Sequence, residues 1–384
     1  MQLIQIPKKG NTTITMVFSN AGARFEDNSI KGISHFVEHL CFKETKSRTQ
    51  KEIALGIEKC GGVLNAFTDW EITAYWTKVA NKYKKQSLDI TQDLVTNPVF
   101  PKEEISKERK VILQELKMYE DNPSTQVYDY LNKKLYNKDS GFYLPIIGTE
   151  KSLTHINKEI LEEYHKKKYE HLTLIQVGDV KENEIYVPEK KIIVPEEIKK
   201  YKRNKFLFKR KDIKQANITI ANYVNLANIP KLDRLIIFNL LGAIYNDMSG
   251  RLFQTIREQN NLVYRIHFYF DIFSCGGVQW RVTLGLDKTK ITKAYNLIIK
   301  ELNKPITKQE LTYAITKLSG QKDIALDNPL NIVSTVAYSI RKGIDWKERI
   351  YNYHKNYERV GHLINDYQKI IDFKENILVG VIPE

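Results

Sequence analysis

Apolar and polar residues in the first half of the chain follow two periods, that of β-strands and that of amphipathic helices. The predicted strands are Leu3–Ile6, Thr12–Ser19, Val63–Thr68, Glu71–Thr77 and Thr173–Val177. The predicted helices are Ile33–Phe42, Thr49–Lys59, Asn81–Thr96, Lys102–Asp121, Gln126–Tyr136 and Lys158–Lys167. Strands and helices therefore mix within one domain, which indicates an α+β fold.

The second half repeats the order β-α-α-β-β-α-α, and its turn Gly276-Gly277 matches Gly61-Gly62 in the first half. The elements predicted there are strands Ala216–Tyr223, Tyr264–Phe273 and Gly277–Leu286, and helices Leu232–Tyr245, Ser249–Gln259, Lys290–Leu302 and one that begins at Pro305. We therefore expect two similar domains, each a mainly antiparallel sheet with helices packed on one face.

A change of composition marks the expected boundary between the domains. Residues 181–209 are rich in Lys and Glu, contain Pro188 and Pro195, and lack helical periodicity, although Ile192–Val194 could form a short strand. This segment is the predicted linker between an N-terminal domain, 1–180, and a C-terminal domain, 210–384. A chain of 384 residues suits two domains.

Composition excludes some classes of protein. No run of 18 apolar residues exists and no secretory signal is visible at the N-terminus, so we expect a cytoplasmic protein without a membrane span. The three cysteines are odd in number and lack C-x-x-C spacing, which indicates reduced, packed thiols.

The net charge of +14 has two interpretations. It could attract acidic partners, or it could reflect lysines scattered over solvated helix faces. The basic residues are not interleaved with stacking aromatic residues, which argues against nucleic acid as a partner.

One helix carries candidate chemistry. In His35-Phe36-Val37-Glu38-His39 the two histidines are four residues apart, so both imidazoles leave one helix face and can bind one metal ion. Glu38 lies on the same face and could accept a proton from water without binding the metal. Two partly buried helix histidines would give the same pattern, so a third ligand is needed.

The helix predicted at 102–121 offers that ligand. Glu108 and Glu115 are two helical turns apart on one face, flanked by apolar residues. A carboxylate on the inner side of a helix is costly unless something pairs with it. Glu115 can be the third ligand and Glu108 a partner that orients a ligand histidine. Alternatively, both are solvated and paired with surface lysines.

These residues resemble the motifs of the pitrilysin/insulysin-type zinc peptidases, the inverzincins. Gly32–Lys43 is similar to the family's metal-binding helix, and Glu108–Leu116 to its helix with the third ligand. The other similar segments are Gly61–Thr68 with Glu71–Thr73, Ile147–Thr149, Ser249–Phe253, and Arg257–Gln259 with Tyr264. The resemblance covers nearly the whole chain and extends to short, two-domain processing-peptidase subunits.

The resemblance implies a role for each matching residue. His35, His39 and Glu115 would bind one Zn²⁺ per chain, Glu38 would be the general base, and Glu108 would orient a ligand. The residues implied to border the substrate strand are Asn65, Ala66 and Thr68, and the pair implied to stabilise the oxyanion is Arg257 and Tyr264. The implied function is a zinc-dependent endopeptidase for peptides or unfolded segments.

In the resembling family, the Arg/Tyr pair faces the zinc from the opposite half of a four-domain clamshell. This chain has two domains, so Arg257 and Tyr264 are expected to serve the zinc of a partner chain. A homodimer is the simple solution and a heterodimer with a related chain the alternative. The activity could be general degradation or dedicated processing of a leader or precursor, for which the basic balance would suit an acidic leader. A rival of another class is a non-catalytic structural subunit.

Overall fold

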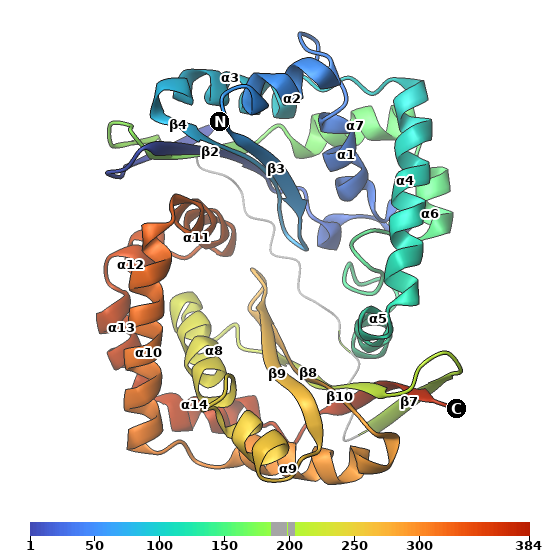
Figure 1. Cartoon of the computed structure of the whole chain (residues 1–384), viewed down its shortest axis with the longest axis vertical. Coiled ribbons are helices and arrows are strands. Elements are labelled where there is room, and N and C mark those ends of the chain that lie inside the picture. Colours follow the sequence, from blue (N-terminus) through green and yellow to red (C-terminus); the bar gives the residue numbers. More distant parts are fainter. Residues whose placement is uncertain (186–197, 199–203) are drawn as a thin grey trace. The chain divides into compact units, whose positions relative to one another are not determined.

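The computed structural model describes residues 1–185, 198 and 204–384, and its strands form two sheets, one from each half of the sequence (Figure 1). The first sheet has the order β3-β4-β2-β5-β1-β6. Its strands are β1 (Gln2–Pro7), β2 (Thr12–Ser19), β3 (Val63–Thr68), β4 (Thr73–Ala80), β5 (Leu172–Gly178) and β6 (Asn183–Ile185). Only β1 and β5 pair in parallel, so this sheet is mixed and mainly antiparallel.

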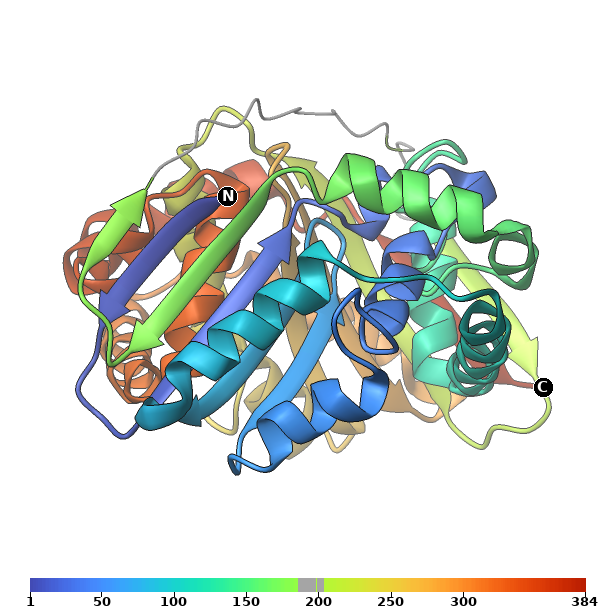
Figure 2. The ribbon, with the colours of Figure 1, turned by 90° about the horizontal axis from the view of Figure 1, so that it is seen from above.

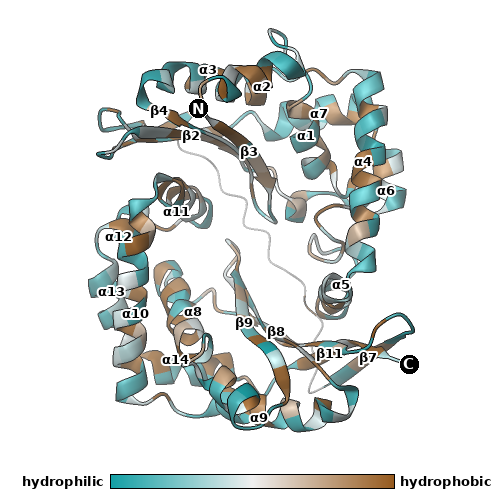
Figure 3. Cartoon of the chain, in the orientation of Figure 1, coloured by the Kyte–Doolittle hydropathy of each residue, from teal (hydrophilic) through white to brown (hydrophobic). Residues whose placement is uncertain are grey.

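Helices of the first half pack on this sheet and bury its core. They are α1 (Ile33–Cys41), α2 (Gln50–Glu58), α3 (Lys84–Thr96), α4 (Lys102–Asp121), α6 (Glu150–His155) and α7 (Lys158–Lys168), whereas α5 (Pro123–Leu135) contacts strands of the second sheet. Figure 2 shows α2 and α3 lying over the strands, and in Figure 3 hydrophobic positions gather on β3 and β4. Phe36, Leu40 and Tyr75 are fully buried in this core.

Among the described residues, the second sheet repeats the topology of the first without a counterpart of β6. Its order is β7-β11-β8-β10-β9, and only β7 and β11 are parallel. The strands are β7 (Asn204–Arg210), β8 (Ala216–Asn225), β9 (Val263–Ile272), β10 (Gly277–Leu286) and β11 (Ile377–Pro383). The helices are α8 (Lys231–Tyr245), α9 (Ile291–Asn303), α10 (Lys308–Asp327), α11 (Pro329–Lys342), α12 (Trp346–Ile350), α13 (Tyr353–Gly361) and α14 (Ile364–Ile371). The predicted α+β fold with two similar domains is confirmed.

The two compact units exchange one helix each. The first unit comprises Met1–Met118, residues 139–185 and Ala325–Arg341, and the second comprises Tyr119–Lys138, the described residues 198–324, and Lys342–Glu384. Helix α5 therefore belongs to the second unit and α11 to the first, whereas the sequence predicted two contiguous domains, 1–180 and 210–384. The two exchanged helices hold equivalent places in the duplicated order.

The sequence predicted helices on one face of each sheet, and the exchanged helices α11 and α5 cover the other face. The Tyr338 ring of α11 stacks on Phe67 of β3 at 6.2 Å, and its hydroxyl donates to Asp69 at 2.9 Å. Since Ala66 packs into the helix-covered core, its neighbour Phe67 points to the other face. In the second unit α5 contacts β8 and β11. Each sheet thus has a helix on its second face as well.

The predicted linker, 181–209, contains structure. Strand β6 lies within it and pairs with β1, and residues 204–209 belong to β7, which pairs with β11 and ends at Arg210. The short strand considered at Ile192–Val194 lies outside the described residues. No described helix combines the length and the hydropathy that crossing a bilayer would need.

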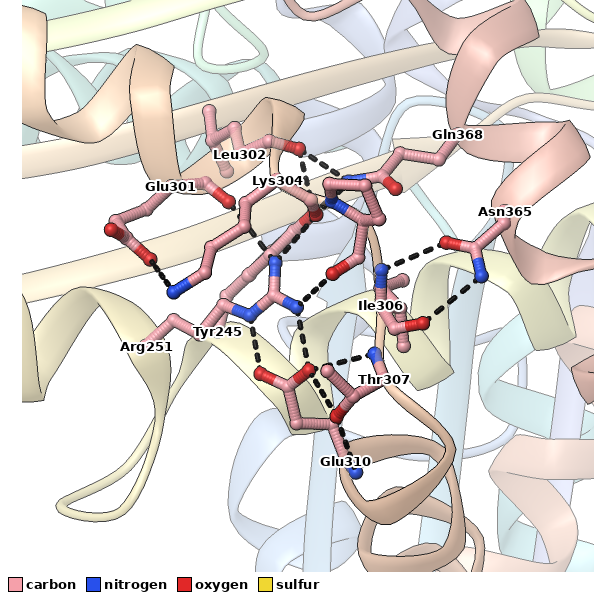
Figure 4. A network of polar contacts seen from close by, with 11 residues as sticks. Tyr245, Arg251, Glu301, Leu302, Lys304, Ile306, Thr307, Glu310, Asn365 and Gln368 are labelled. Atoms are coloured by element: carbon pink, nitrogen blue, oxygen red, sulfur yellow. Dashed lines mark hydrogen bonds and ion pairs between the residues drawn. The ribbon is translucent and has the colours of Figure 1, made fainter.

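A buried arginine fixes the end of α9 in the second unit (Figure 4). The guanidinium of Arg251 donates to the carbonyls of Lys304 and Pro305, both at 2.7 Å, and forms an ion pair with Glu310. Glu310 also accepts the backbone N–H of Thr307 at 2.9 Å, which caps α10. The Arg251 hydrogen bond lowers the pKa of Glu310 from 4.5 to about 2, and the Thr307 amide acts in the same direction against the effect of burial.

This pair predicts acid-dependent stability. Because the folded pKa of Glu310 is depressed, its contribution is present above pH 4.5 and is lost as the pH falls toward 2. The side chain is 30% exposed, so we discount the full linkage energy to about 2 kcal/mol. Thermal unfolding should show Glu310→Gln less stable than wild type at pH 7, with the difference shrinking below pH 4.5. The matched change Glu162→Gln removes an exposed pair with Lys158 and should have little effect. A Glu310→Gln deficit that is constant from pH 7 to pH 3 would contradict this account.

Candidate metal centre

Helix α1 begins at a tight, capped turn. Gly32 has φ +94°, and a Cβ there would lie 2.4 Å from the carbonyl oxygen of Ile147, so only glycine fits without displacement. The backbone N–H groups of Gly32 and Ser34 donate to the buried carboxylate of Glu26 at 2.9 and 2.8 Å. An acid at this position satisfies free amides of the helix start and complements its dipole. Glu26 precedes the helix by seven residues, too far for a local capping pattern to indicate it.

The structure brings the three expected ligands together. A ring nitrogen of His35, a ring nitrogen of His39 and a carboxylate oxygen of Glu115 all lie within 4.8 Å of one another. The carboxylate oxygen Oε2 of Glu115, on α4, is 3.8 Å from Nε2 of His35 and 3.9 Å from Nε2 of His39, both on α1. All three residues are in the first unit.

This donor set fits a zinc ion. Two imidazole nitrogens and one carboxylate oxygen are a common set for catalytic zinc and leave the fourth position open. Atoms bonded to one zinc ion at about 2.0–2.2 Å lie roughly 3.3–3.6 Å apart in tetrahedral geometry. The observed separations of 3.8 and 3.9 Å need to close by only a few tenths of an ångström.

Glu108 lies behind His39. Its Oε2 is 3.0 Å from Nδ1 of His39, and its Oε1 is 2.7 Å from Nζ of Lys43. Glu108 is 6% exposed, so its charge is compensated by these two partners rather than by water. A proton on Nδ1 of His39 that is donated to Glu108 leaves the lone pair of Nε2 free for a metal ion.

The imidazole of His35 is neutral at physiological pH, as a metal ligand would have to be. Burial, and secondarily the neighbouring His39, lower the pKa of His35 to about 3. Its Nδ1 is buried and has no hydrogen-bond partner among the described residues. The unprotonated imidazole is the form that binds metals.

Glu38 stands next to the three ligands in a partly apolar setting. Burial raises the pKa of its carboxyl, while the hydrogen bond from Thr68 opposes that rise. The Thr68 hydroxyl donates to Oε2 of Glu38 at 2.5 Å and comes from β3. A carboxylate of raised pKa is a better proton acceptor near neutral pH. The contact also links the general-base candidate to a strand expected to border the substrate.

Cysteines take no part in this site. Burial raises the pKa of the Cys41 thiol to about 12, and its Sγ lies 3.5 Å from the hydroxyl of Tyr75. Such a thiol is neither nucleophilic nor a ready metal ligand. Cys60 and Cys275 are also free.

Strand β3 forms one edge of the first sheet, as a substrate-binding strand would require. It pairs with β4 on one side, and no described strand pairs with its other side. Asn65 is exposed, and its side-chain oxygen accepts the backbone N–H of Ala66 at 2.8 Å. Tyr338 was not a candidate from the sequence. Its ring stacks on Phe67 and its hydroxyl donates to Asp69, and both contacts hold the end of β3 in place.

Arg257 and Tyr264 lie together in the second unit. The guanidinium of Arg257 is 5.0 Å from the ring centroid of Tyr264 and 4.6 Å from that of Phe253. Arg257 is on a π-helical segment, Phe253–Glu258, where the sequence predicted an ordinary helix. Such segments occur often at functional sites. Tyr264 is 78% exposed, so its hydroxyl is available to a ligand.

Comparison with known proteins gives two family matches. A model described as Insulinase (Peptidase family M16) matches residues 3–149, and one described as Peptidase M16 inactive domain matches residues 155–318. An uncharacterized zinc protease of Rickettsia felis is 32% identical over 349 residues, covering 87% of this chain and 81% of that protein. The mitochondrial-processing peptidase subunit beta of Mus musculus is 34% identical over 179 residues, covering 46% of this chain and 36% of that protein.

The fold also matches solved structures. A crystal structure of a protease from Helicobacter pylori superposes with a TM-score of 0.87 at 17% identity, covering all of this chain and 97% of that one. At this identity the match concerns the fold alone. The candidate metal ligands lie in the range matched by the insulinase model, and Arg257 and Tyr264 in the range matched by the inactive-domain model.

Proposed function

The chain belongs to the peptidase M16 family, and we propose that it is a zinc-dependent endopeptidase that cleaves peptides or unfolded segments. One observation carries the proposal: His35, His39 and Glu115 converge with Glu38 beside them. A non-catalytic subunit, the rival function, would have no use for this set. The similarity to uncharacterized zinc proteases supports the same reading.

Each residue has a defined part in the proposed reaction. A zinc ion held by His35, His39 and Glu115 would polarise the scissile carbonyl and acidify the attacking water. Glu38 accepts the proton of that water and passes it to the leaving amine. Glu108 holds the His39 ring through Nδ1 and so keeps Nε2 directed at the ion.

The edge of β3 offers the substrate a strand to pair with. A peptide that adds there bonds through its main chain, so its sequence matters less than its ability to become extended. To pair with the N–H of Ala66 it displaces the side-chain oxygen of Asn65. The scissile bond then lies beside Thr68, whose hydroxyl contacts Glu38.

We further propose that the protein works as a dimer with composite sites enclosed in a chamber. Arg257 and Tyr264 belong to a different unit from the metal ligands. In a homodimer they would donate to the oxyanion at the partner's site. The relative named as a subunit of a processing peptidase supports a multi-chain arrangement. The three free cysteines suit the cytoplasm as the location.

A peptide digest tests the proposed activity. Purified protein is incubated with a mixture of unstructured peptides, and the products are identified by mass spectrometry. We expect cleavage at internal bonds that a zinc chelator stops and added zinc restores. Absence of any chelator-sensitive cleavage would remove the proposed function, and cleavage confined to one precursor would favour dedicated processing.

A further inference from the structure

The second unit contains a pocket of about 440 Å³ that the proposed chemistry does not use. It lies between α5 and the strands β8, β9 and β10. Its described lining has two arginines, Arg265 and Arg281, and no acidic residue. Pockets of this volume are typical of small-ligand sites and can hold a few amino-acid residues.

Strand register places the polar side chains in the pocket. On β10, Arg281 is opposite Tyr269 of β9, and Thr283 is opposite Thr219 of β8. Side chains alternate along a strand, so these residues face α5, whose Tyr128 contacts Arg281, while Val282 points to the other face. The pairing of β10 with β9 is irregular at Gly285, which lines the same pocket as Arg265.

The two arginines differ in their surroundings. Arg281 is held in place by an ion pair with Asp271 and by the rings of Tyr128 and Tyr269, whose centroids are 4.8 and 5.2 Å from its guanidinium. Arg265 is exposed and has no ion-pair partner in the described part of the chain. Since Asp271 compensates one of the two charges, the pocket keeps a net positive charge.

Two hydroxyl groups are among the hydrogen-bond donors of the pocket lining. The hydroxyls of Thr219 and Thr283 have no hydrogen-bond partner among the described residues. Both hydroxyl oxygens are accessible to solvent, so a ligand in the pocket can reach them. An oxygen-rich anion in the pocket would find these hydroxyls beside the two guanidinium groups. A guanidinium and a carboxylate form strong, directional hydrogen bonds because both groups are planar.

We propose that this pocket binds a carboxylate of the substrate peptide, at a distance along the chain from the bond that is cut. The inference rests on the proposed peptidase function and narrows it to substrates that carry a negative charge. A carboxylate can come from an internal Glu or Asp or from the C-terminus of the peptide, and the pocket chemistry suits both. Arg265 supplies the positive charge that no carboxylate compensates. Arg281, whose position is fixed by Asp271 and two tyrosine rings, supplies a second guanidinium group next to the carboxylate.

Kinetics with matched peptides test the proposal. One cleavable peptide is made in four versions, with an internal Glu or Gln and with a C-terminal acid or amide. We expect wild type to show a KM about tenfold lower for a charged version than for its neutral counterpart. In Arg265→Gln this ratio should fall toward one. The pair of versions that shows the effect identifies the source of the carboxylate.

A matched control distinguishes binding in the pocket from long-range attraction of charged peptides to the positively charged protein. Lys308→Gln removes the same charge from an exposed position of the same unit and should keep the wild-type ratio. An equal ratio in wild type and Arg265→Gln would overturn the proposal. So would equal losses in Arg265→Gln and Lys308→Gln, because they would assign the preference to long-range attraction.

Direct binding keeps the test independent of catalysis. The four peptides carry a neutral dye, and their affinity for wild type and Arg265→Gln is measured by fluorescence anisotropy. If no peptide is cleaved but charged versions bind wild type more tightly than Arg265→Gln, the pocket stands and the peptidase function fails. If the peptides are cleaved but charged and neutral versions have equal affinities and equal KM values, the peptidase function stands and the proposed role of the pocket fails.

Discussion

Replacing Glu38 with glutamine should lower kcat for peptide hydrolysis by about 10³–10⁴-fold while the protein keeps its fold and its metal ligands. Glutamine has nearly the shape of glutamate and can still accept the hydrogen bond from Thr68, which is 2.5 Å from Oε2. It cannot take a proton from water. The loss should therefore appear in kcat, with a small change in KM, when initial rates are measured on one peptide.

The control for this variant is Glu58→Gln on α2, an exposed position away from the metal ligands. It should retain wild-type rates. Retention of substantial activity by Glu38→Gln would assign proton transfer to another group and remove Glu38 from the mechanism.

Mixing two inactive variants should restore activity if sites are shared between chains. Arg257→Ala should lose about 10²–10³-fold in kcat, because it removes a donor to the oxyanion. After subunit exchange with Glu38→Gln, half of the dimers contain one chain of each kind. Each such dimer has one site with both an intact Glu38 and an intact Arg257, so about a quarter of wild-type activity should return.

Subunit exchange must be verified independently, by mixing chains that carry two different fluorescent labels. If the labels exchange and the mixture stays inactive, Arg257 does not act on the partner's site. The metal ligands and Arg257 would then have to work within one chain, or Arg257 would have another role.

Local signals explain why much of the fold could be predicted from the sequence. Strands β2, β3 and β10 and helix α4 have the predicted bounds, because alternation, a Gly-Gly turn and Pro101 mark their limits. Thr49 caps α2 through a reciprocal pair with Glu52, which is a local sequence feature. The two-turn spacing of Glu108 and Glu115 likewise depends on helix geometry alone.

Features set by distant contacts were not predictable. Tyr338 contacts Asp69 across 269 positions of sequence, so no local pattern shows that α11 belongs to the first unit. Glu26 precedes α1 by a turn and a short 3-10 segment, and only the folded chain brings its carboxylate to the helix start. The π-helical segment at Arg257 has the apolar spacing of an ordinary helix, so its widening was not visible.

The exchange of α5 and α11 has a common origin in the duplication. Each follows a 20-residue helix, α4 or α10, and each falls in the opposite unit from the sheet of its own half. A contiguous division at the expected linker therefore separates helices from the sheets that they cover. Expression of residues 1–180 alone would leave the first sheet without α11.

Activity as a function of bound zinc tests the central claim most directly. Zinc is removed from the purified protein by a chelator and returned in known increments, while bound metal is measured by elemental analysis and peptide hydrolysis is followed in parallel. The account predicts that hydrolysis rises in proportion to bound zinc and reaches its plateau at one zinc ion per chain. Full hydrolysis by the zinc-free protein, or zinc bound at this stoichiometry by a protein in which His35 and His39 are both replaced by alanine, would contradict it.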